Sequence, residues 1–446
     1  MTALAQSQFV EQHGNALLRK FPNQPVPPTV TRAEGAYLVL DDGRKLLDAN
    51  AGGSSFAVLG FSHPDVLDAM RDQMTRYCHI DFNSWNNPLA EELAALILSR
   101  APAGLSRVYL AGGSGSEAVE AAMKLSYQVH HDQGQPDRTW IISRNQSYHG
   151  ATLGGLMASE LGNLNFYAPL LPAHHARIAQ HHPLYHRRDD ESLDDYARRS
   201  AQDLEDKILE IGADKVCAFI GETMLSAMVG DVPPAPGYWQ YIREICDRHG
   251  IHLILDEVYC GLGRSGRSFC CEWDGVRPDF VTVGKTLAAG FVPLSAVVTT
   301  EAVASAIADG PQGRIQHGHT HQGHGLGVAA ALAVQKIVQT DAMLSRVDEL
   351  GKRMRASLRN AIGAHAYLRE IRGRGLLFSL EYDCPDKNNF GTRIAEMLKT
   401  EDGILLNSKW HRMSFAPPFI LSNEEADHIT NAVARAFFAT ADGWEN

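Results

Sequence analysis

Between about residues 105 and 300, short apolar segments alternate with longer segments of helical periodicity, and this alternation restricts the possible folds more than any other feature. The apolar segments read RVYLA, TWIIS, VCAFIG, HLILDEV, DFVTVG and LSAVVTT. Parallel strands joined by crossover helices have this pattern, because helices cover both faces of each strand. The sequence therefore predicts an α/β domain in which a mostly parallel sheet lies between two layers of helices.

The remainder of the chain predicts a smaller α+β domain. After Gly323 come two long helical patterns, two short strands and a final helix, and an N-terminal hairpin with the turn DDGR is expected to complete this unit. Residues 160–200 are rich in His, Arg and Asp without a clear period, so we expect them to be largely loop. The predicted division is 1–60 for the N-terminal arm and hairpin, 61–335 for the large domain and 336–446 for the C-terminal domain.

Charge and cysteine content argue against several classes of protein. The 446 residues carry a formal net charge of −11, whereas a nucleic-acid or anionic-membrane surface needs a basic face. The seven cysteines are odd in number and form no C-x-x-C pair, which favours a reducing compartment. The N-terminus does not resemble a signal peptide, and no apolar run reaches the roughly 18 residues that span a bilayer. We therefore expect a cytoplasmic protein.

A glycine-rich segment, GGSGSE (residues 112–117), lies between a predicted strand and a predicted helix. Glycines let backbone N–H groups approach a phosphate, and a helix N-terminus adds partial positive charge. The segment has neither the spacing of a dinucleotide fingerprint nor the lysine of a P-loop. On local sequence alone it is either a phosphate site or a plain flexible loop.

Two charged residues follow predicted strands. Asp256 lies near the C-terminal end of HLILDEV, and Lys285 comes directly after DFVTVG, so both are expected at the ligand-binding edge of a parallel sheet. Taken singly, Asp256 is equally well a structural turn cap, and an ordinary surface lysine is the favoured interpretation of Lys285. Together with the glycine-rich segment they offer a phosphate cradle, a carboxylate for a protonated ring nitrogen and an amine for an aldehyde. These are three principal handles on pyridoxal phosphate.

Several of these segments also resemble one known family. LILDEVYCGLGRSG, PDFVTVGKTLAAG, SGSEAVEAAMK, SYHG and GHTHQGHGLGVAAALA are similar to the signature segments of class III (ω-type) aminotransferases, and they occur in the same order. The resemblance extends from about residue 30 to the end of the chain. It implies fold type I, with a large domain built on a mostly parallel seven-stranded sheet plus a smaller α+β domain, and pyridoxal 5′-phosphate as cofactor.

The resemblance also implies roles for individual residues. Lys285 is the residue that forms the Schiff base with the cofactor, and Asp256 pairs with the ring nitrogen. Gly115 and Ser116 are expected to hold the phosphate. Tyr148 is expected to stack on one face of the cofactor ring, and Val258 to pack on the other. Glu222 is expected beneath the site, and Thr320 is expected to reach the phosphate bound by the neighbouring subunit. A homodimer with composite active sites, or a tetramer, follows from the role of Thr320.

The sequence departs from many relatives where they bind a substrate carboxylate. Ser414 replaces the arginine of the R-F-A-P-P motif, and Asn407 occupies the place of the mobile arginine of some amine transaminases. Ala227 replaces the glutamate that neutralises the missing arginine, and a buried unpaired glutamate would be costly there. We therefore expect no Arg/Glu switch. Arg412 is either an alternative carboxylate clamp or an ordinary surface arginine.

The expected substrate pocket includes an apolar wall and small hydroxyl-bearing residues. The candidates are Ser54, Ser55, Phe56, Phe82 and Trp85. Each of them is either a pocket residue or an ordinary core or loop residue. His317, His319, His321 and His324 are dense enough to suggest a metal site, but they lie in the segment of Thr320, so we expect no metal.

The favoured function is transfer of an amino group from a primary amine or ω-amino acid to a keto acid such as pyruvate. An alternative keeps the cofactor but makes the enzyme an ammonia- or phospho-lyase, since the same core residues occur in non-transaminase members of the family. A non-catalytic His-rich interaction protein is the third alternative. It would leave the three cofactor handles unexplained.

Overall fold

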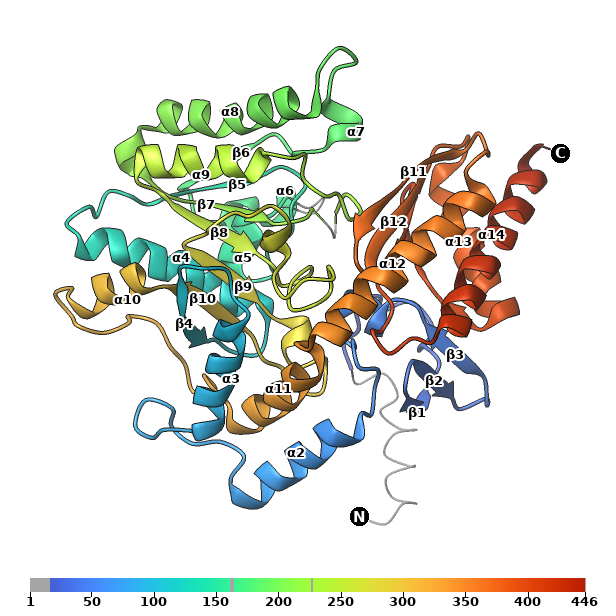
Figure 1. The fold of residues 1–446 in the computed structure, drawn as a ribbon, viewed down its shortest axis with the longest axis horizontal. Coiled ribbons are helices and arrows are strands. Elements are labelled where there is room, and N and C mark those ends of the chain that lie inside the picture. Colours follow the sequence, from blue (N-terminus) through green and yellow to red (C-terminus); the bar gives the residue numbers. More distant parts are fainter. Residues whose placement is uncertain (1–16, 161–163, 226–227, 446) are drawn as a thin grey trace.

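The computed structural model describes residues 17–160, 164–225 and 228–445, which form one large sheet and two smaller ones. Figure 1 shows the large sheet with its helices on one side of the molecule and the two smaller sheets on the other. The long helix α12 (Asp341–Ile362) runs between the two regions. Within the described residues, no helix is long and apolar enough to cross a membrane.

The large sheet has seven strands in the order β4-β10-β9-β8-β7-β5-β6, and only β10 is antiparallel to its neighbours. The prediction of a mostly parallel sheet is confirmed. Carboxyl ends of the parallel strands therefore meet along one edge, where Glu222, Asp256 and Thr282 are direct neighbours across β7, β8 and β9. The bounds are β4 Leu105–Leu110, β5 Trp140–Arg144, β6 His175–Ile178, β7 Val216–Glu222, β8 His252–Asp256, β9 Phe280–Val283 and β10 Ala296–Thr300.

Helices cover both faces of this sheet because successive strand residues point to opposite sides. On β8, Leu253 and Leu255 pack into one core and Ile254 into another. The first core lies under α3 (Pro88–Ser99), α8 (Leu193–Ile211), α9 (Tyr238–His249) and α11 (Gly325–Val338), and the second under α4 (Gly115–Asp132) and α10 (Glu301–Ala308). Helices α2 (Pro64–Arg76) and α5 (Leu153–Ala158) complete this half.

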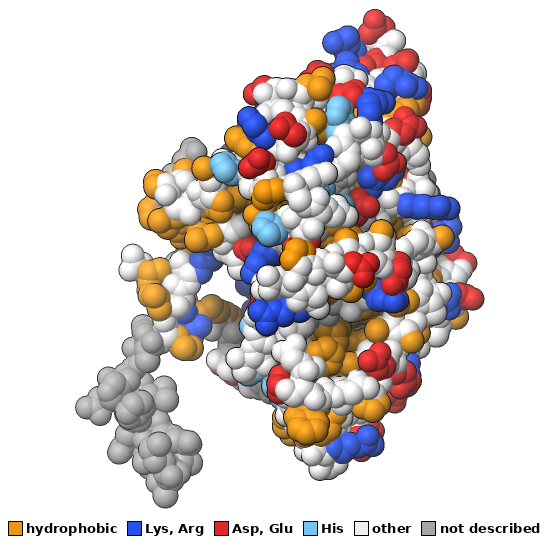
Figure 2. All heavy atoms as spheres, turned by 90° about the vertical axis from the view of Figure 1, so that its left-hand side faces the viewer, with side chains coloured by type: hydrophobic (Ala, Val, Ile, Leu, Met, Phe, Trp, Pro, Cys, Tyr) orange, Lys and Arg blue, Asp and Glu red, His pale blue; other side chains and the backbone are white. Residues whose placement is uncertain are grey.

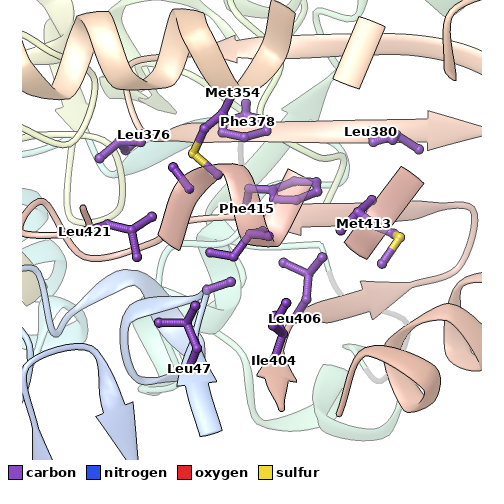
Figure 3. Close-up of a cluster of buried hydrophobic side chains, with 14 of the residues drawn as sticks. Leu47, Met354, Leu376, Phe378, Leu380, Ile404, Leu406, Met413, Phe415 and Leu421 are labelled. Atoms are coloured by element: carbon purple, nitrogen blue, oxygen red, sulfur yellow. The ribbon is translucent and has the colours of Figure 1, made fainter. Parts of the chain in front are cut away.

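The two smaller sheets share a single hydrophobic core (Figure 3). One consists of β1 Val30–Glu34, β2 Tyr37–Leu40, β3 Lys45–Asp48 and β13 Ile404–Leu405, and the other of β11 Leu368–Arg374, β12 Leu377–Tyr382, β15 Arg412–Phe415 and β14 Asn407–Lys409. Leu47 from the N-terminal hairpin packs in the same cluster as Ile404 and Phe415. Helices α12, α13 (Lys387–Met397) and α14 (Asn423–Glu445) cover it. The hairpin thus packs with the C-terminal elements. The domain boundaries drawn from the sequence stay a prediction.

The expectation that residues 160–200 are largely loop is wrong. This stretch contains the short helices α6 (Leu164–Tyr167) and α7 (Pro183–His186), strand β6 at the sheet edge and the first turns of α8. The helical signal of α8 rests on Tyr196, Ala197 and Leu204, which are buried, among many charged residues on the opposite face. Because β6 is a short edge strand of only four residues, it gave little periodicity to detect.

The surface view in Figure 2 shows acidic and basic side chains interspersed over one face, with hydrophobic side chains between them. No continuous basic area is visible on that face.

Close packing of α12 against the turn between β11 and β12 makes Gly351 sensitive to substitution. A Cβ there would overlap the carbonyl oxygen of Gly375, which is backbone and cannot rotate away. We predict that Gly351→Ala lowers the free energy of unfolding in urea by about 1–3 kcal/mol, the usual cost of overpacking. Gly443→Ala in α14 is the matched control, because no atom lies within 4 Å of its added Cβ. Equal stability of the two variants would contradict this packing.

Candidate active site

A pocket of about 840 Å³ opens at the carboxyl edge of the large sheet. Its walls come from the ends of β7 and β8, the residues after β9 and the N-terminus of α4, while the small sheets contribute the segment Ala51–Ser55 and the hairpin of β14 and β15. Of the residues predicted from the sequence, those that line it are Ser54, Phe56, Gly115, Ser116, Tyr148, Glu222, Asp256, Val258 and Lys285. The pocket therefore lies where the two halves of the molecule meet.

The N-terminus of α4 is open toward the pocket. Ser114 is the N-cap, and its backbone N–H donates to the Glu117 carboxylate at 2.7 Å in a capping box. Gly115 packs against Val258 so closely that a Cβ would lie 2.5 Å from a Val258 methyl carbon. A side chain is therefore excluded at Gly115, and the first backbone N–H groups of an 18-residue helix face the pocket together with the Ser116 hydroxyl. This is a suitable site for an anion.

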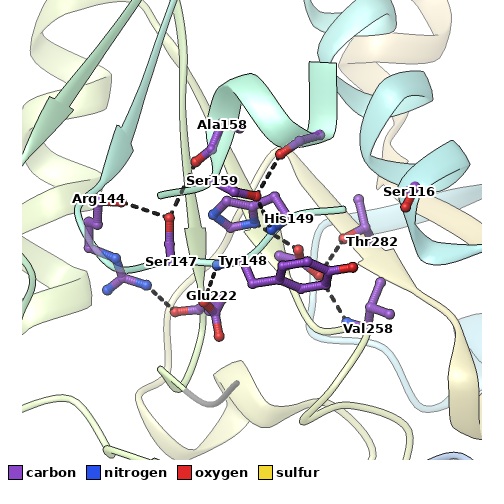
Figure 4. A network of polar contacts seen from close by, with 12 residues as sticks. Ser116, Arg144, Ser147, Tyr148, His149, Ala158, Ser159, Glu222, Val258 and Thr282 are labelled. Carbon is purple, nitrogen blue, oxygen red and sulfur yellow. Dashed lines mark hydrogen bonds and ion pairs between the residues drawn. The ribbon is translucent and has the colours of Figure 1, made fainter. Parts of the chain in front are cut away.

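Asp256 is buried at the end of β8 and is held by three donors (Figure 4). Oδ2 accepts a hydrogen bond from His149 Nδ1 at 2.8 Å, and Oδ1 accepts from the Thr282 hydroxyl at 3.0 Å and from the Val258 N–H at 3.1 Å. Burial by itself would raise the pKa of Asp256, but the His149 hydrogen bond and charge, the Val258 N–H and the Lys285 ammonium together lower it. The carboxyl group is therefore ionised at neutral pH.

Lys285 follows β9 with a positive φ of 40°, a backbone conformation that non-glycine residues rarely adopt. Its ammonium lies 5.0 Å from the centre of the Tyr259 ring. Burial lowers the pKa of Lys285, while the carboxylates of Asp256 and Glu222 oppose that shift. The net lowering favours the free amine, which is the nucleophilic form.

The loop after β5 brings Tyr148 to the pocket. The backbone N–H of Tyr148 donates to Glu222 Oε1 at 2.9 Å, and the backbone carbonyl of Glu222 accepts from the buried Arg144 guanidinium. Figure 4 shows this network, with the Tyr148 ring and the Val258 side chain coming from two different loops. Glu222 therefore fixes the loop that carries the aromatic ring.

The comparisons with known proteins agree on one family. A family model for class III aminotransferases matches residues 20–437. An uncharacterised aminotransferase of Schizosaccharomyces pombe is 33% identical, over 98% of this chain and 98% of its own length. A taurine–pyruvate aminotransferase of Bilophila wadsworthia is 31% identical, over 92% of each. The crystal structure of an omega transaminase from Pseudomonas jessenii in complex with PMP has a TM-score of 0.90 at 28% identity, over 99% of each chain. The chain belongs to the class III aminotransferases.

Membership of this family confirms the fold type I architecture and the aminotransferase activity expected from the sequence. Class III aminotransferases use pyridoxal phosphate, and this aminotransferase is therefore a pyridoxal-phosphate enzyme.

Four residues expected at the aminotransferase site do not line the pocket within this chain. Ser55 is fully buried beside it, and its hydroxyl makes no hydrogen bond to a described residue. Phe82 packs against Gly323, and Trp85 is 68% exposed. Thr320 is exposed, and its carbonyl oxygen lies 2.7 Å from His79 Nε2. The segments of Phe82 and Thr320 therefore pack together, away from this chain's own pocket.

Arg412 does not line the pocket either. Its side chain is 2% exposed, its guanidinium donates to the Met228 carbonyl oxygen at 2.5 Å, and burial lowers its pKa to about 10. The expectation of an Arg412 carboxylate clamp therefore finds no support, because the guanidinium is buried beside Asp231 and bonded to a backbone carbonyl oxygen. Ser414 and Asn407 do line the pocket, and Asn407 Nδ2 donates to the Gly53 carbonyl oxygen at 2.7 Å. The Ala227 position lies outside the described residues.

Two groups at the pocket were not predicted from the sequence. His149 contacts Asp256 directly, and its only signal was its place next to Tyr148 in SYHG. Lys409 and Lys20 line the pocket, and neither follows a recognisable motif. In the histidine-rich segment, the rings of His324 and His79 stack at 4.8 Å between centroids. The described residues contain no group of three or more side chains placed to hold a metal ion.

We predict that His149→Leu weakens cofactor retention in acid. The charged carboxylate of Asp256 supports cofactor binding only above its pKa. Loss of the imidazole raises this pKa, so on acidification the carboxylate becomes protonated at a higher pH than in the wild type. The pH at which half the pyridoxal phosphate is released should rise by about one unit. Absorbance after gel filtration between pH 4 and 8 measures it. His130→Leu also removes a buried imidazole, one bonded to the Cys217 carbonyl oxygen, and is the control. An unchanged midpoint for His149→Leu would contradict the role of His149.

Proposed function

We propose that this aminotransferase moves an amino group from a primary amine or ω-amino acid to a keto acid such as pyruvate, with Lys285 as the residue that holds the cofactor covalently. One observation carries the proposal. An ionised buried carboxylate, a lysine with a lowered pKa and an open helix N-terminus line one pocket. Each matches a different part of pyridoxal phosphate, namely the ring nitrogen, the aldehyde and the phosphate.

The residues present fit the cofactor. Exclusion of a Cβ at Gly115 leaves backbone N–H groups bare at the phosphate end, where Ser116 adds a hydroxyl. Asp256 would pair with the ring nitrogen, while Tyr148 and Val258 would contact the two faces of the ring. When bound, pyridoxal phosphate supplies an electron sink for the carbanion formed when the carbon bearing the amino group loses a proton.

The chain's own residues supply the proton chemistry. Asp256 stays ionised because His149, Thr282 and Val258 donate to it, so it would hold the ring nitrogen of the bound cofactor in its protonated form. The amine of Lys285 has a lowered pKa, which would suit it to accept and return the proton at the reacting carbon. Glu222 holds the backbone of Tyr148 and so keeps the ring in place.

The pocket wall supports a donor without an α-carboxylate. Ser414 lies where many relatives carry the clamping arginine, and Arg412 is buried and does not line the pocket. Phe56, Met224 and Met228 make much of the remaining wall apolar, which suits an alkyl or aryl chain. The relative named as a taurine–pyruvate aminotransferase is consistent with an ω-amino donor and with pyruvate as acceptor.

We also propose a homodimer, or a tetramer of four chains, with composite active sites. Thr320, Phe82 and Trp85 lie outside this chain's pocket, and Trp85 is largely exposed. A second copy that covers this surface would remove the exposed ring from water and bring the Thr320 segment toward the neighbouring phosphate site. A reducing compartment such as the cytoplasm is proposed because all seven cysteines are free thiols and six of them are buried.

Borohydride reduction of the purified holoenzyme, followed by digestion and mass spectrometry, should place the pyridoxyl label on Lys285. Lys285→Ala should lower the rate of amino transfer by at least about 10³-fold, because it removes the general acid–base. Lys215→Ala, a surface lysine outside the pocket, should keep full activity. A label on another residue would overturn the assignment. Release of ammonia from the amine without any keto acid would indicate a lyase instead.

The assembly is tested by light scattering after gel filtration. We predict a mass of twice or four times 48.9 kDa for the wild-type chain. Trp85→Glu should shift the distribution toward monomer and reduce activity in parallel, because a charge cannot be buried unpaired in an interface. Trp410→Glu alters another exposed tryptophan, at the turn of the β14–β15 hairpin, and should leave the mass unchanged. A fully active monomer would contradict a composite site.

A further inference from the structure

The hairpin of β14 and β15 presents four polar residues on one face. Asn407 pairs with Ser414 and Lys409 pairs with Arg412 in the antiparallel register, and residues two apart on a strand point to the same side. Asn407, Lys409 and Ser414 line the pocket, whereas Arg412 is buried behind it. A cation, Lys409, therefore lies at the pocket, two positions after Asn407.

The two cations of this pair differ in how they are neutralised. Arg412 lies close to the buried carboxylate of Asp231, which raises the pKa of Arg412 against the effect of burial. Asp231 accepts from the Ser379 hydroxyl at 2.6 Å, and Ser379 in turn contacts the Ser414 hydroxyl at 3.1 Å. The charge of Arg412 is thus balanced within the hydrogen-bonded network behind the pocket wall.

Lys409 has no such compensation. In the described part of the chain, no ion pair is found for Lys409 or for Lys20, which also lines the pocket. Partial burial of the amine lowers the pKa of Lys409, and so do the positive charges of Arg412 and Lys20, while Asp231 opposes the shift. Like charges opposite each other on neighbouring strands are unfavourable, and a bound anion would relieve the repulsion.

We infer that Lys409, assisted by Lys20, binds the carboxylate of an ω-amino acid donor and of the keto-acid acceptor at the mouth of this pocket. The inference rests on the proposed function and names its substrate class. The lysine ammonium is a point charge on a flexible chain, whereas the arginine guanidinium is a rigid planar group. Lys409 therefore suits donor and acceptor carboxylates that lie at different depths in the pocket. Asn407 and Ser414 add neutral hydrogen-bonding groups on the same face. Lys409 is a specificity-determining residue, and no proton transfer is assigned to it.

The test compares 4-aminobutanoate with butylamine, which has the same chain without the carboxylate. In half-reactions of the holoenzyme followed by the cofactor absorbance, Lys409→Met should lower the preference for 4-aminobutanoate over butylamine about tenfold, through the apparent Kd of the amine and not through the limiting rate. Lys409→Arg should restore most of it, because it keeps the charge. Lys215→Met, which removes an exposed lysine far from the pocket lining, should change neither substrate.

Calorimetric titration of the holoenzyme with butanoate, which carries no amine, gives a readout independent of turnover. Lys409→Met should raise the Kd for butanoate about tenfold, and the wild-type Kd should rise with salt. Unchanged butanoate affinity and unchanged substrate preference in Lys409→Met would overturn the inference. If no amine changes the cofactor spectrum, the proposed function fails, but the butanoate titration still decides whether Lys409 is an anion site.

Discussion

The carboxylate of Asp256 lies at the end of a central strand, with helices on both faces of the sheet and little access to water. An ion in such a place is stable only if donors and a cation surround it. The neighbouring strands supply Thr282, the following turn supplies the Val258 N–H, and the loop after β5 supplies His149. The same constraint favours a cationic partner on the pocket side, and in the proposed function this partner is the ring nitrogen of pyridoxal phosphate. The proposed position of the cofactor thus follows from the burial of one charge.

The pocket depends equally on a fixed contact between the two halves of the molecule. Arg264, fully buried in the loop region after β8, donates to the carbonyl oxygens of Leu376 at 3.0 Å and Pro417 at 2.5 Å. These acceptors belong to the segments that lead into β12 and out of β15. The hairpin bearing Lys409 and Ser414 includes β15, so this contact helps to hold it in place relative to Asp256 and Lys285. In the proposed function, the large sheet binds the cofactor, and the wall that the small sheets provide selects the substrate.

The sequence predicted the central strands, the helix after GGSGSE and the meeting of Asp256 with Lys285, because each rests on local periodicity and on the rule that parallel strands end at one edge. It did not predict the donor to Asp256, since His149 is 107 residues away in the chain. It left Arg412 open between a carboxylate clamp and a surface arginine, because the burial of this side chain beside Asp231 depends on a residue far away in the chain that the local sequence does not show. The proposed roles of Phe82 and Thr320 depend on a second copy, which a single-chain pattern cannot locate.

The state of the cofactor ring nitrogen tests the central claim most directly. Holoenzyme reconstituted with pyridoxal phosphate labelled with ¹⁵N in the ring should give a ¹⁵N resonance at the protonated position across the pH range of stability. Asp256→Asn, which keeps the shape but removes the charge, should move it to the unprotonated position. An unprotonated nitrogen in the wild-type enzyme at neutral pH, or a resonance unaffected by Asp256→Asn, would contradict the account.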